Sequence, residues 1–546
     1  LNNSFVRPLI NHQLLSAYHM AFSQNSCNFS VPGAGKTSTV YAAYTYLKNL
    51  PVSNPKYVDK LLVIGPLSSF PSWEGEYIKC FGRFPDSLRL SGDSPGENGA
   101  TVATTMPEKE NHLYSSSPKE LTLMNYSALQ FITEQVKDFL KQNKVMVVVD
   151  EAHRIKNSEG VWGQAAIEIA KEANSRVILT GTPFPNGYED LYNLIRFIYP
   201  YKFREIMRTN NAQLKEMTKS NLSIQNDRVN IFVENIKPFF IRVKEKELKL
   251  PNPKEEIVKV SMDGIQRKIY DFVFSKFKPY FQDNQSATVK DVLTRARILR
   301  LRQAATNPAL LLKPIIENME MSKDGDGYDL NNIYENVTME FDDSELVEDI
   351  IRFQETTTPQ KFVKTKEIYE NKIMPYGAKV IVWTIFLQNA FELKKYLSVS
   401  GIEAKLLIGS VDQLEREKTI KEFNNPENDD FKVVIANPFS VAESISLHEG
   451  CQNAIYIERD YNAANFIQSK NRIHRVGMPE GTTANYYQVI SEQSIDEAIH
   501  KKLSEKVIRM KEILNQDIPL LARLDDNDET DLVTFMMNEY KDYNAD

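Results

Sequence analysis

Cysteine is scarce in this sequence, and its three cysteines, Cys27, Cys80 and Cys451, lie far apart. Their spacing matches no set of zinc or other metal ligands and is not typical of a disulfide framework. The pattern favours buried thiols in a reducing compartment. We therefore expect an intracellular protein, in the cytoplasm and nucleoid or in the nucleus, without zinc.

Long apolar runs are also missing. No stretch approaches the roughly 20 residues that are needed to span a bilayer. Residues 1–10 have neither the basic start nor the apolar core of a signal peptide. We therefore expect no membrane partner. The chain begins with leucine, which is compatible with an excerpt of a longer protein.

An excess of positive charge is absent as well, since the formal net charge is −7. This balance argues against a protein that coats nucleic acid nonspecifically, but it leaves room for a local basic groove. With 42% hydrophobic and 25% charged residues, the composition is that of a globular protein. A chain of 546 residues is too long for one core and suggests about three or four domains.

A glycine-rich stretch, SVPGAGKT over residues 30–37, follows a short apolar turn at 27–29 and precedes a helical pattern over 38–50. Such a loop exposes backbone N–H groups to phosphate oxygens, and the helix N-terminus favours their charge. Lys36 would reach the β- and γ-phosphates of ATP, and the Thr37 hydroxyl would bind Mg²⁺. The remaining nucleotide-binding candidates here are Gly33, Ala34, Gly35 and Ser38, with Gln13 upstream for an adenine edge. The simpler alternatives are a helix-start loop with a solvated lysine and a surface glutamine.

Buried parallel strands are predicted at residues 60–66, 121–126, 144–150 and 175–179. The third, KVMVVVD, ends in Asp150 and is followed by Glu151. Ligands of open α/β sheets bind at the carboxyl edge of the strands, where these carboxylates emerge. Asp150 would hold Mg²⁺, through a water, and Glu151 would polarise an attacking water. The alternative is an acidic pair that caps the next helix.

The second half repeats the strand pattern, at residues 378–385, 432–436, 453–458 and 484–490, without a phosphate loop of its own. It offers Gln468, Arg472 and Arg475 instead. The two arginines are three residues apart, so on a helix they would share one face and could neutralise charge on a transferred phosphoryl group. A structural ion-pair network is the alternative. We expect His474 to pack or to hydrogen-bond.

These motifs resemble those of the Swi/Snf-type ATPases of helicase superfamily two, and the resemblance covers nearly the whole chain. Its most specific part is DEAHRIKN over residues 150–157, since ordinary helicases with Asp-Glu-Ala-His lack the Lys-Asn. Further matches are Arg7-Pro8, Gln13, the phosphate loop, residues 63–66, Trp73, Glu76, residues 179–183, Asn186, Leu191, residues 380–383, Gly409, Arg416, Asp496 and Lys506. The chain departs from the family at Ser30-Val31-Pro32, Pro185, residues 437–444 and Met478.

The resemblance implies two RecA-like lobes, doubly wound parallel α/β sheets with helical insertions. The boundaries that we expect are 1–200 for the first ATP-binding lobe, 201–255 for its helical protrusion, 256–320 for a helical insertion of the second lobe, 321–358 for an acidic linker, 359–510 for the second lobe and 511–546 for an acidic C-terminal helix or tail.

The resemblance further implies a DNA-stimulated ATPase that couples hydrolysis to movement along duplex DNA without separating its strands. Phosphate contacts would come from loops at residues 66–69 and 125–126, at Thr384 and at Gly409. Three alternatives stay open: a strand-separating DNA or RNA helicase, a remover of stalled polymerases or other proteins from DNA, and a scaffold that binds ATP without hydrolysing it. The biological pathway is open too.

Overall fold

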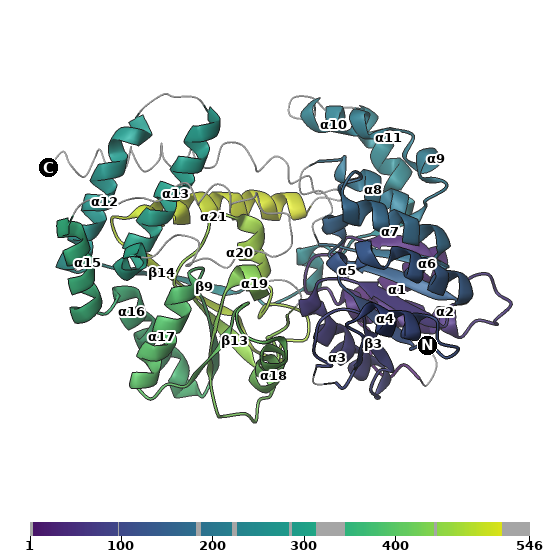
Figure 1. The fold of residues 1–546 in the computed structure, drawn as a ribbon, viewed down its shortest axis with the longest axis horizontal. Helices are drawn as coiled ribbons and strands as arrows, with labels where there is room; N and C mark the ends of the chain where they lie inside the picture. Colours follow the sequence, from purple (N-terminus) through teal and green to yellow (C-terminus); the bar gives the residue numbers. More distant parts are fainter. Residues whose placement is uncertain are drawn as a thin grey trace. The chain divides into compact units, whose positions relative to one another are not determined.

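The computed structural model describes residues 4–96, 98–181, 187–220, 227–282, 287–312, 344–441 and 445–515. The chain forms two compact units, one made mainly of Leu1–Leu250 and the other mainly of Pro251–Ala442 with Ser446–Arg509. In Figure 1 the first unit runs from purple to teal and the second from teal to yellow. None of the described helices is long and apolar enough to cross a membrane.

The first unit has one parallel sheet of eight strands, in the order β4-β3-β5-β2-β6-β7-β1-β8. Its strands are β1 (Asn25–Asn28), β2 (Lys60–Ile64), β3 (Ser87–Arg89), β4 (Thr101–Val102), β5 (Leu121–Met124), β6 (Val145–Asp150), β7 (Ser175–Leu179) and β8 (Phe240–Ile241). Its helices are α1 (Asn11–Ser23), α2 (Lys36–Lys48), α3 (Phe70–Phe81), α4 (Met106–Leu113), α5 (Tyr126–Phe131), α6 (Thr133–Gln142), α7 (Val161–Glu172), α8 (Asp190–Ile198), α9 (Phe203–Met207), α10 (Asn211–Ser220) and α11 (Asp227–Ile236).

Strand β6 lies inside this sheet and is buried on both faces, as its continuous apolar run predicts. Met146 and Val148 belong to the core that α1, α2 and α3 form with one face of the sheet. Val145, Val147 and Val149 belong to the core that α5 to α8 form with the other face. Helices thus cover both faces of the sheet (Figure 1), and the carboxyl end of β6 lies at the edge of the sheet.

The second unit also has one parallel sheet, of six strands, in the order β11-β12-β10-β13-β14-β9. The strands are β9 (Lys254–Val260), β10 (Lys379–Trp383), β11 (Ala404–Leu407), β12 (Val433–Ala436), β13 (Cys451–Tyr456) and β14 (Asn485–Ser491). The helices are α12 (Gly264–Gln282), α13 (Ala287–Thr306), α15 (Ser344–Thr356), α16 (Gln360–Ile368), α17 (Leu387–Val399), α18 (Gln413–Asn424), α19 (Pro438–Val441), α20 (Ala463–Lys470) and α21 (Ile495–Leu514).

The strands that the sequence predicts in both halves are all present, and the two parallel α/β lobes are confirmed. No sequence pattern predicts the other six strands, β1, β3, β4, β8, β9 and β11, which are short or polar. The expected turn at residues 27–29 is largely strand β1, whose sequence is NSCN. Strand β8 closes the first sheet beside β1, and the charged strand β9 pairs with β14 at the edge of the second sheet.

The expected acidic linker, residues 321–358, differs from the structure in its second half. Residues 321–343 lie outside the described residues, but helix α15 occupies 344–356. Leu346, Ile350 and Phe353 are buried on one face of α15, in a core with α12, α13 and the start of α21. The helical spacing of these three apolar residues outweighs the acidic composition of the segment.

Candidate functional site

The site begins with three parallel strands whose carboxyl ends are level. Asn28 of β1 pairs with Leu179 of β7, and Leu179 in turn pairs with Asp150 of β6. The phosphate loop follows β1, Thr180 and Gly181 follow β7, and Glu151 follows β6. All three connections therefore emerge at the edge of the sheet where ligands of open α/β sheets bind.

The glycine-rich loop has the backbone that only glycine adopts at no cost. Gly33 and Gly35 have φ angles of 82° and 80°, and α2 begins directly after Gly35, at Lys36. A Cβ atom at Gly35 would lie 2.1 Å from Nε2 of Gln13, so this position has no room for a side chain. The Gln13 amide also donates to the Ala34 carbonyl at 3.4 Å, while the His12 ring approaches the same oxygen at 3.2 Å.

The polar side chains at the start of α2 have different partners. The Lys36 ammonium donates to the carbonyls of Ser30, at 3.1 Å, and Val31, at 3.4 Å. Thr37 is half-buried, whereas the buried Ser38 donates its hydroxyl proton to Glu76. Glu76 also forms a salt bridge with Arg7 at 2.5 Å. Ser38 thus reaches toward α3, which the sequence did not indicate.

The Asp150 carboxylate is held by two donors. Trp73 Nε1 donates to Oδ2 at 3.0 Å, and the backbone N–H of Glu151 donates to Oδ1 at 3.1 Å. Burial, and after it the charge of Glu151, raise the pKa of Asp150 to about 6, although the Trp73 bond and the charge of Lys36 work in the other direction. Trp73 and Glu76 belong to the motifs noted above, but no sequence pattern indicates that they contact Asp150 and Ser38.

Glu151 stands on a left-handed backbone, with φ of 53° and ψ of 49°. This conformation is uncommon for a residue other than glycine and costs about 1 kcal/mol or more. Its Oε2 lies 3.5 Å from Nδ1 of His153, in the short helix that follows. The Glu151 carboxylate thus lies beside the short helix Ala152–Ile155 that follows it.

The loop after β7 packs directly against the phosphate loop. A Cβ atom at Gly181 would lie 2.8 Å from Cδ of Pro32, so the two loops touch at this glycine. Thr180 is fully buried, and its N–H donates to the Asn28 carbonyl at 3.2 Å. The rest of this motif, residues 182–186, lies outside the described residues.

In the second unit Gln468 lies on α20, but this helix ends at Lys470. Arg472 and Arg475 therefore lie in the turn after it, and the expectation that they share one face of a helix is wrong. Arg472 is buried, with its Nε 3.1 Å from the Gln468 carbonyl. His474, as expected, makes a hydrogen bond, to the Pro251 carbonyl at 2.8 Å.

The donor set in the first unit suits a magnesium nucleotide. The Thr37 hydroxyl and the Asp150 carboxylate offer the oxygen ligands that Mg²⁺ prefers, and Mg²⁺ is commonly held by one or two such groups together with substrate phosphates. Among the described residues, no group of three or more His, Cys, Asp or Glu side chains could hold a metal by itself. The three cysteines are free and buried, as expected.

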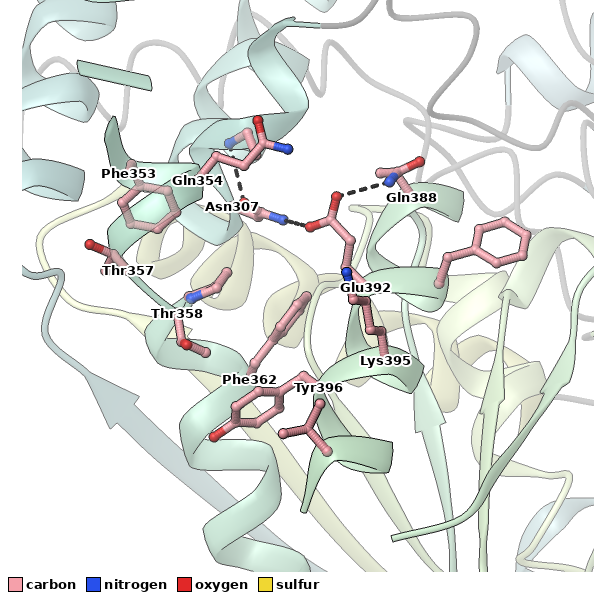
Figure 2. A pocket seen from close by; sticks show the side chains of 14 residues that line it. Asn307, Phe353, Gln354, Thr357, Thr358, Phe362, Gln388, Glu392, Lys395 and Tyr396 are labelled. Atoms are coloured by element: carbon pink, nitrogen blue, oxygen red, sulfur yellow. Dashed lines mark hydrogen bonds between the residues drawn. The ribbon is translucent and has the colours of Figure 1, made fainter. Parts of the chain in front are cut away.

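A separate pocket of about 510 Å³ lies in the second unit, between α15, α16 and α17. Figure 2 shows the Glu392 carboxylate beside the amides of Asn307 and Gln388, which donate to it at 2.6 and 2.9 Å. Phe362 and Tyr396 line the pocket below them. It includes none of the residues that the sequence predicted to bind nucleotide.

The family model of the SNF2-related domain matches residues 29–310, which is more than half of the chain. The family model of the helicase conserved C-terminal domain matches residues 363–477. The chain belongs to the SNF2-related family. This membership confirms the resemblance that the sequence indicates, and with it the helicase-like ATPase class. In this SNF2-related chain the stretch from the phosphate loop to Gly181 lies in the first of these domains, and Gln468, Arg472 and Arg475 lie in the second.

Relatives of this SNF2-related chain include Protein CHROMATIN REMODELING 5 of Arabidopsis thaliana, 25% identical over 93% of this chain and 27% of that protein. ATP-dependent helicase FUN30 of Saccharomyces cerevisiae is 25% identical over 87% of this chain and 44% of its own length. The SWI2/SNF2 ATPase core of Sulfolobus solfataricus in complex with dsDNA is 20% identical, with a TM-score of 0.38 over 97% of both chains. The chain thus spans less than half of these two curated relatives.

Proposed function

We propose that this chain is a DNA-stimulated ATPase that moves along duplex DNA. One observation carries the proposal: the phosphate loop follows β1, and Asp150 and Glu151 lie at the end of β6, where both strands end level at one edge of a parallel sheet. The SNF2-related family, with relatives named for chromatin remodelling, supports the choice of duplex DNA as the track. Its site of action would be intracellular, where such DNA is found.

In the first unit Lys36 would neutralise the phosphates of ATP, and Gln13 would contact the adenine. Thr37 and Asp150 would hold Mg²⁺, which when bound draws charge away from the phosphate oxygens. Glu151 would accept a hydrogen bond from the attacking water and orient it. The bond from Trp73 keeps Asp150 oriented and favours its charged form.

The second unit would supply further positive charge for the reaction. Arg472 and Arg475 would stabilise the negative charge that develops on the transferred phosphoryl group, and Gln468 would lie beside the nucleotide. An arginine supplied in this way contributes about 10³ to 10⁵ to the rate in GTPases. The Arg472 backbone carbonyl accepts a hydrogen bond from Leu447 at 3.0 Å, which fixes the turn that carries both arginines.

The DNA contacts that we propose come from the loops after β2, β5 and β11. Leu67 and Ser68 are half-buried at the start of one loop, Asn125 is half-buried in the next, and Gly409 is exposed. We propose no DNA contact from Thr384, because this residue is fully buried and its hydroxyl donates to the Phe386 carbonyl at 3.4 Å. Contacts to the phosphate groups of DNA make the affinity for DNA fall steeply as the salt concentration rises.

The deciding experiment is the ATPase rate with duplex DNA, single-stranded DNA or RNA, together with displacement of a third strand from a triplex. We expect stimulation and triplex displacement with duplex DNA, and none in Lys36→Ala. Unwinding of a fluorescent duplex would identify a strand-separating helicase instead. Binding of ATP without any turnover, with or without nucleic acid, would leave only the scaffold.

A further inference from the structure

Ser30 opens the phosphate loop and is almost fully buried. Each of its polar groups has a partner. Its N–H donates to Asn28 Oδ1 at 3.0 Å, its carbonyl accepts from the Lys36 ammonium at 3.1 Å, and its hydroxyl oxygen accepts from the Val243 N–H at 3.0 Å. The same residue therefore contacts the catalytic lysine and a segment 213 positions later.

That later segment continues the pairing of β8 along β1 and beyond the end of the ladder. Phe29 donates to the Ile241 carbonyl at 2.8 Å, and Val31 donates to the Val243 carbonyl at 3.1 Å. In a regular parallel ladder the Val243 N–H would meet a backbone carbonyl. Here the Ser30 hydroxyl accepts it, while the Arg242 guanidinium donates to the Phe29 carbonyl at 2.6 Å.

The segment also leads out of the first unit. After Val243 comes a short helix, Glu245–Leu248, and the first unit ends at Leu250. Residues 240–250 are thus at once the strand that holds the entry of the phosphate loop and the last part of the unit before the chain crosses over. Any ordering of the loop acts on the same hydrogen bonds that hold this crossover segment.

We infer that Ser30 and Arg242 are positioning residues. They hold the phosphate loop in the conformation that binds ATP, and they couple the binding of ATP to the order of residues 240–250. The inference rests on the proposed function, since it takes ATP as the ligand of the loop. Loss of the Ser30 hydroxyl leaves the Val243 N–H without its acceptor. The loop is then held less firmly against residues 240–250, and with it the Ser30 carbonyl that accepts from Lys36. The affinity of the chain for ATP then falls, whereas the side chains that would carry out hydrolysis are unchanged.

The test compares Ser30→Ala, Ser30→Thr and Ser175→Ala in the full chain. Ser175 is a matched control, since it is fully buried in the same sheet and donates to the Gln24 carbonyl, at the opposite end of β7. We expect Ser30→Ala to raise KM for ATP roughly tenfold with kcat changed less than about threefold. Ser30→Thr, which keeps the hydroxyl, restores KM, and Ser175→Ala leaves it unchanged.

Amide hydrogen exchange of residues 240–250 gives the second readout. In the wild type a magnesium complex of a non-hydrolysable ATP analogue slows exchange there, and in Ser30→Ala this slowing is lost. An unchanged KM together with unchanged slowing would overturn the inference, as would equal effects of Ser175→Ala. If the wild type binds the analogue but never hydrolyses ATP, the proposed function fails, while the exchange result still decides the inference.

Discussion

Replacing Asp150 by asparagine should change how the stability of the first unit depends on pH. In the folded chain burial and the charge of Glu151 raise the pKa of Asp150 from 3.8 to about 6. The folded state therefore binds a proton more tightly than the unfolded chain does. This carboxyl group favours folding below pH 3.8, and its contribution is lost as the pH rises through 6.

The difference of about two pH units corresponds to at most about 3 kcal/mol. About half of it, on the order of 1 kcal/mol, falls between pH 5 and pH 8. Over that range the wild type should lose this amount of unfolding free energy relative to Asp150→Asn. Asparagine has one acceptor oxygen where Asp150 has two, so the variant loses the hydrogen bond from either Trp73 or the Glu151 N–H. This loss is independent of pH, so it does not affect the pH dependence of the difference between the two proteins.

Urea unfolding at several pH values, followed by tryptophan fluorescence, measures the difference, because Trp73 is buried beside Asp150. Asp138→Asn is the control: this carboxylate lies on α6 of the same unit and is 46% exposed, so its variant should track the wild type. A difference between wild type and Asp150→Asn that stays constant from pH 5 to pH 8 would refute the reasoning. The variant should also lose most of its ATPase activity.

Three further predictions concern other residues. Glu151→Gln should bind ATP within a few-fold of the wild type yet hardly turn it over, as measured by nucleotide binding and phosphate release; turnover at the wild-type rate would remove Glu151 from its role. Arg475→Ala should lose most ATPase activity, while duplex DNA binding at fixed salt stays within about twofold; equal losses of both would indicate misfolding. Asn307→Ala should destabilise the second unit by about 2–4 kcal/mol, because this buried amide donates to Asn389 at 3.0 Å and Glu392 at 2.6 Å. Urea unfolding measures that loss, and Gln388→Ala, at the half-exposed side of the same carboxylate, should cost less than about 1.5 kcal/mol.

The strands that carry the first-unit site could be predicted because their side chains leave no other solution. Val145 to Val149 have no polar face, so the strand is buried on both sides and its carboxyl end opens at the sheet edge. The glycine pattern likewise predicts the loop before α2, since Gly33 and Gly35 need positive φ angles. In these places local pattern and tertiary structure agree.

The structure differs from the sequence predictions where long-range pairing decides. Strand β1 has a polar sequence, and only its neighbours β7 and β8 make it a strand. Arg472 and Arg475 have helical spacing, yet α20 ends at Lys470 and the chain turns there. The hydrogen bond from Trp73 to Asp150 spans 77 residues, and no periodicity in the sequence indicates such a contact.

The late partner of β1 has a consequence for the order in which this chain can fold. Residues 25–28 are made before both of their neighbours in the sheet, since β7 follows about 150 residues later and β8 about 213 residues later. At about 5–20 residues per second, the ribosome adds these residues in roughly 10–40 s. The glycine-rich loop, although it is made before most of its sheet, therefore gains its last neighbouring strand only when β8 is made. Until then its edge is open to chaperones or to mispairing.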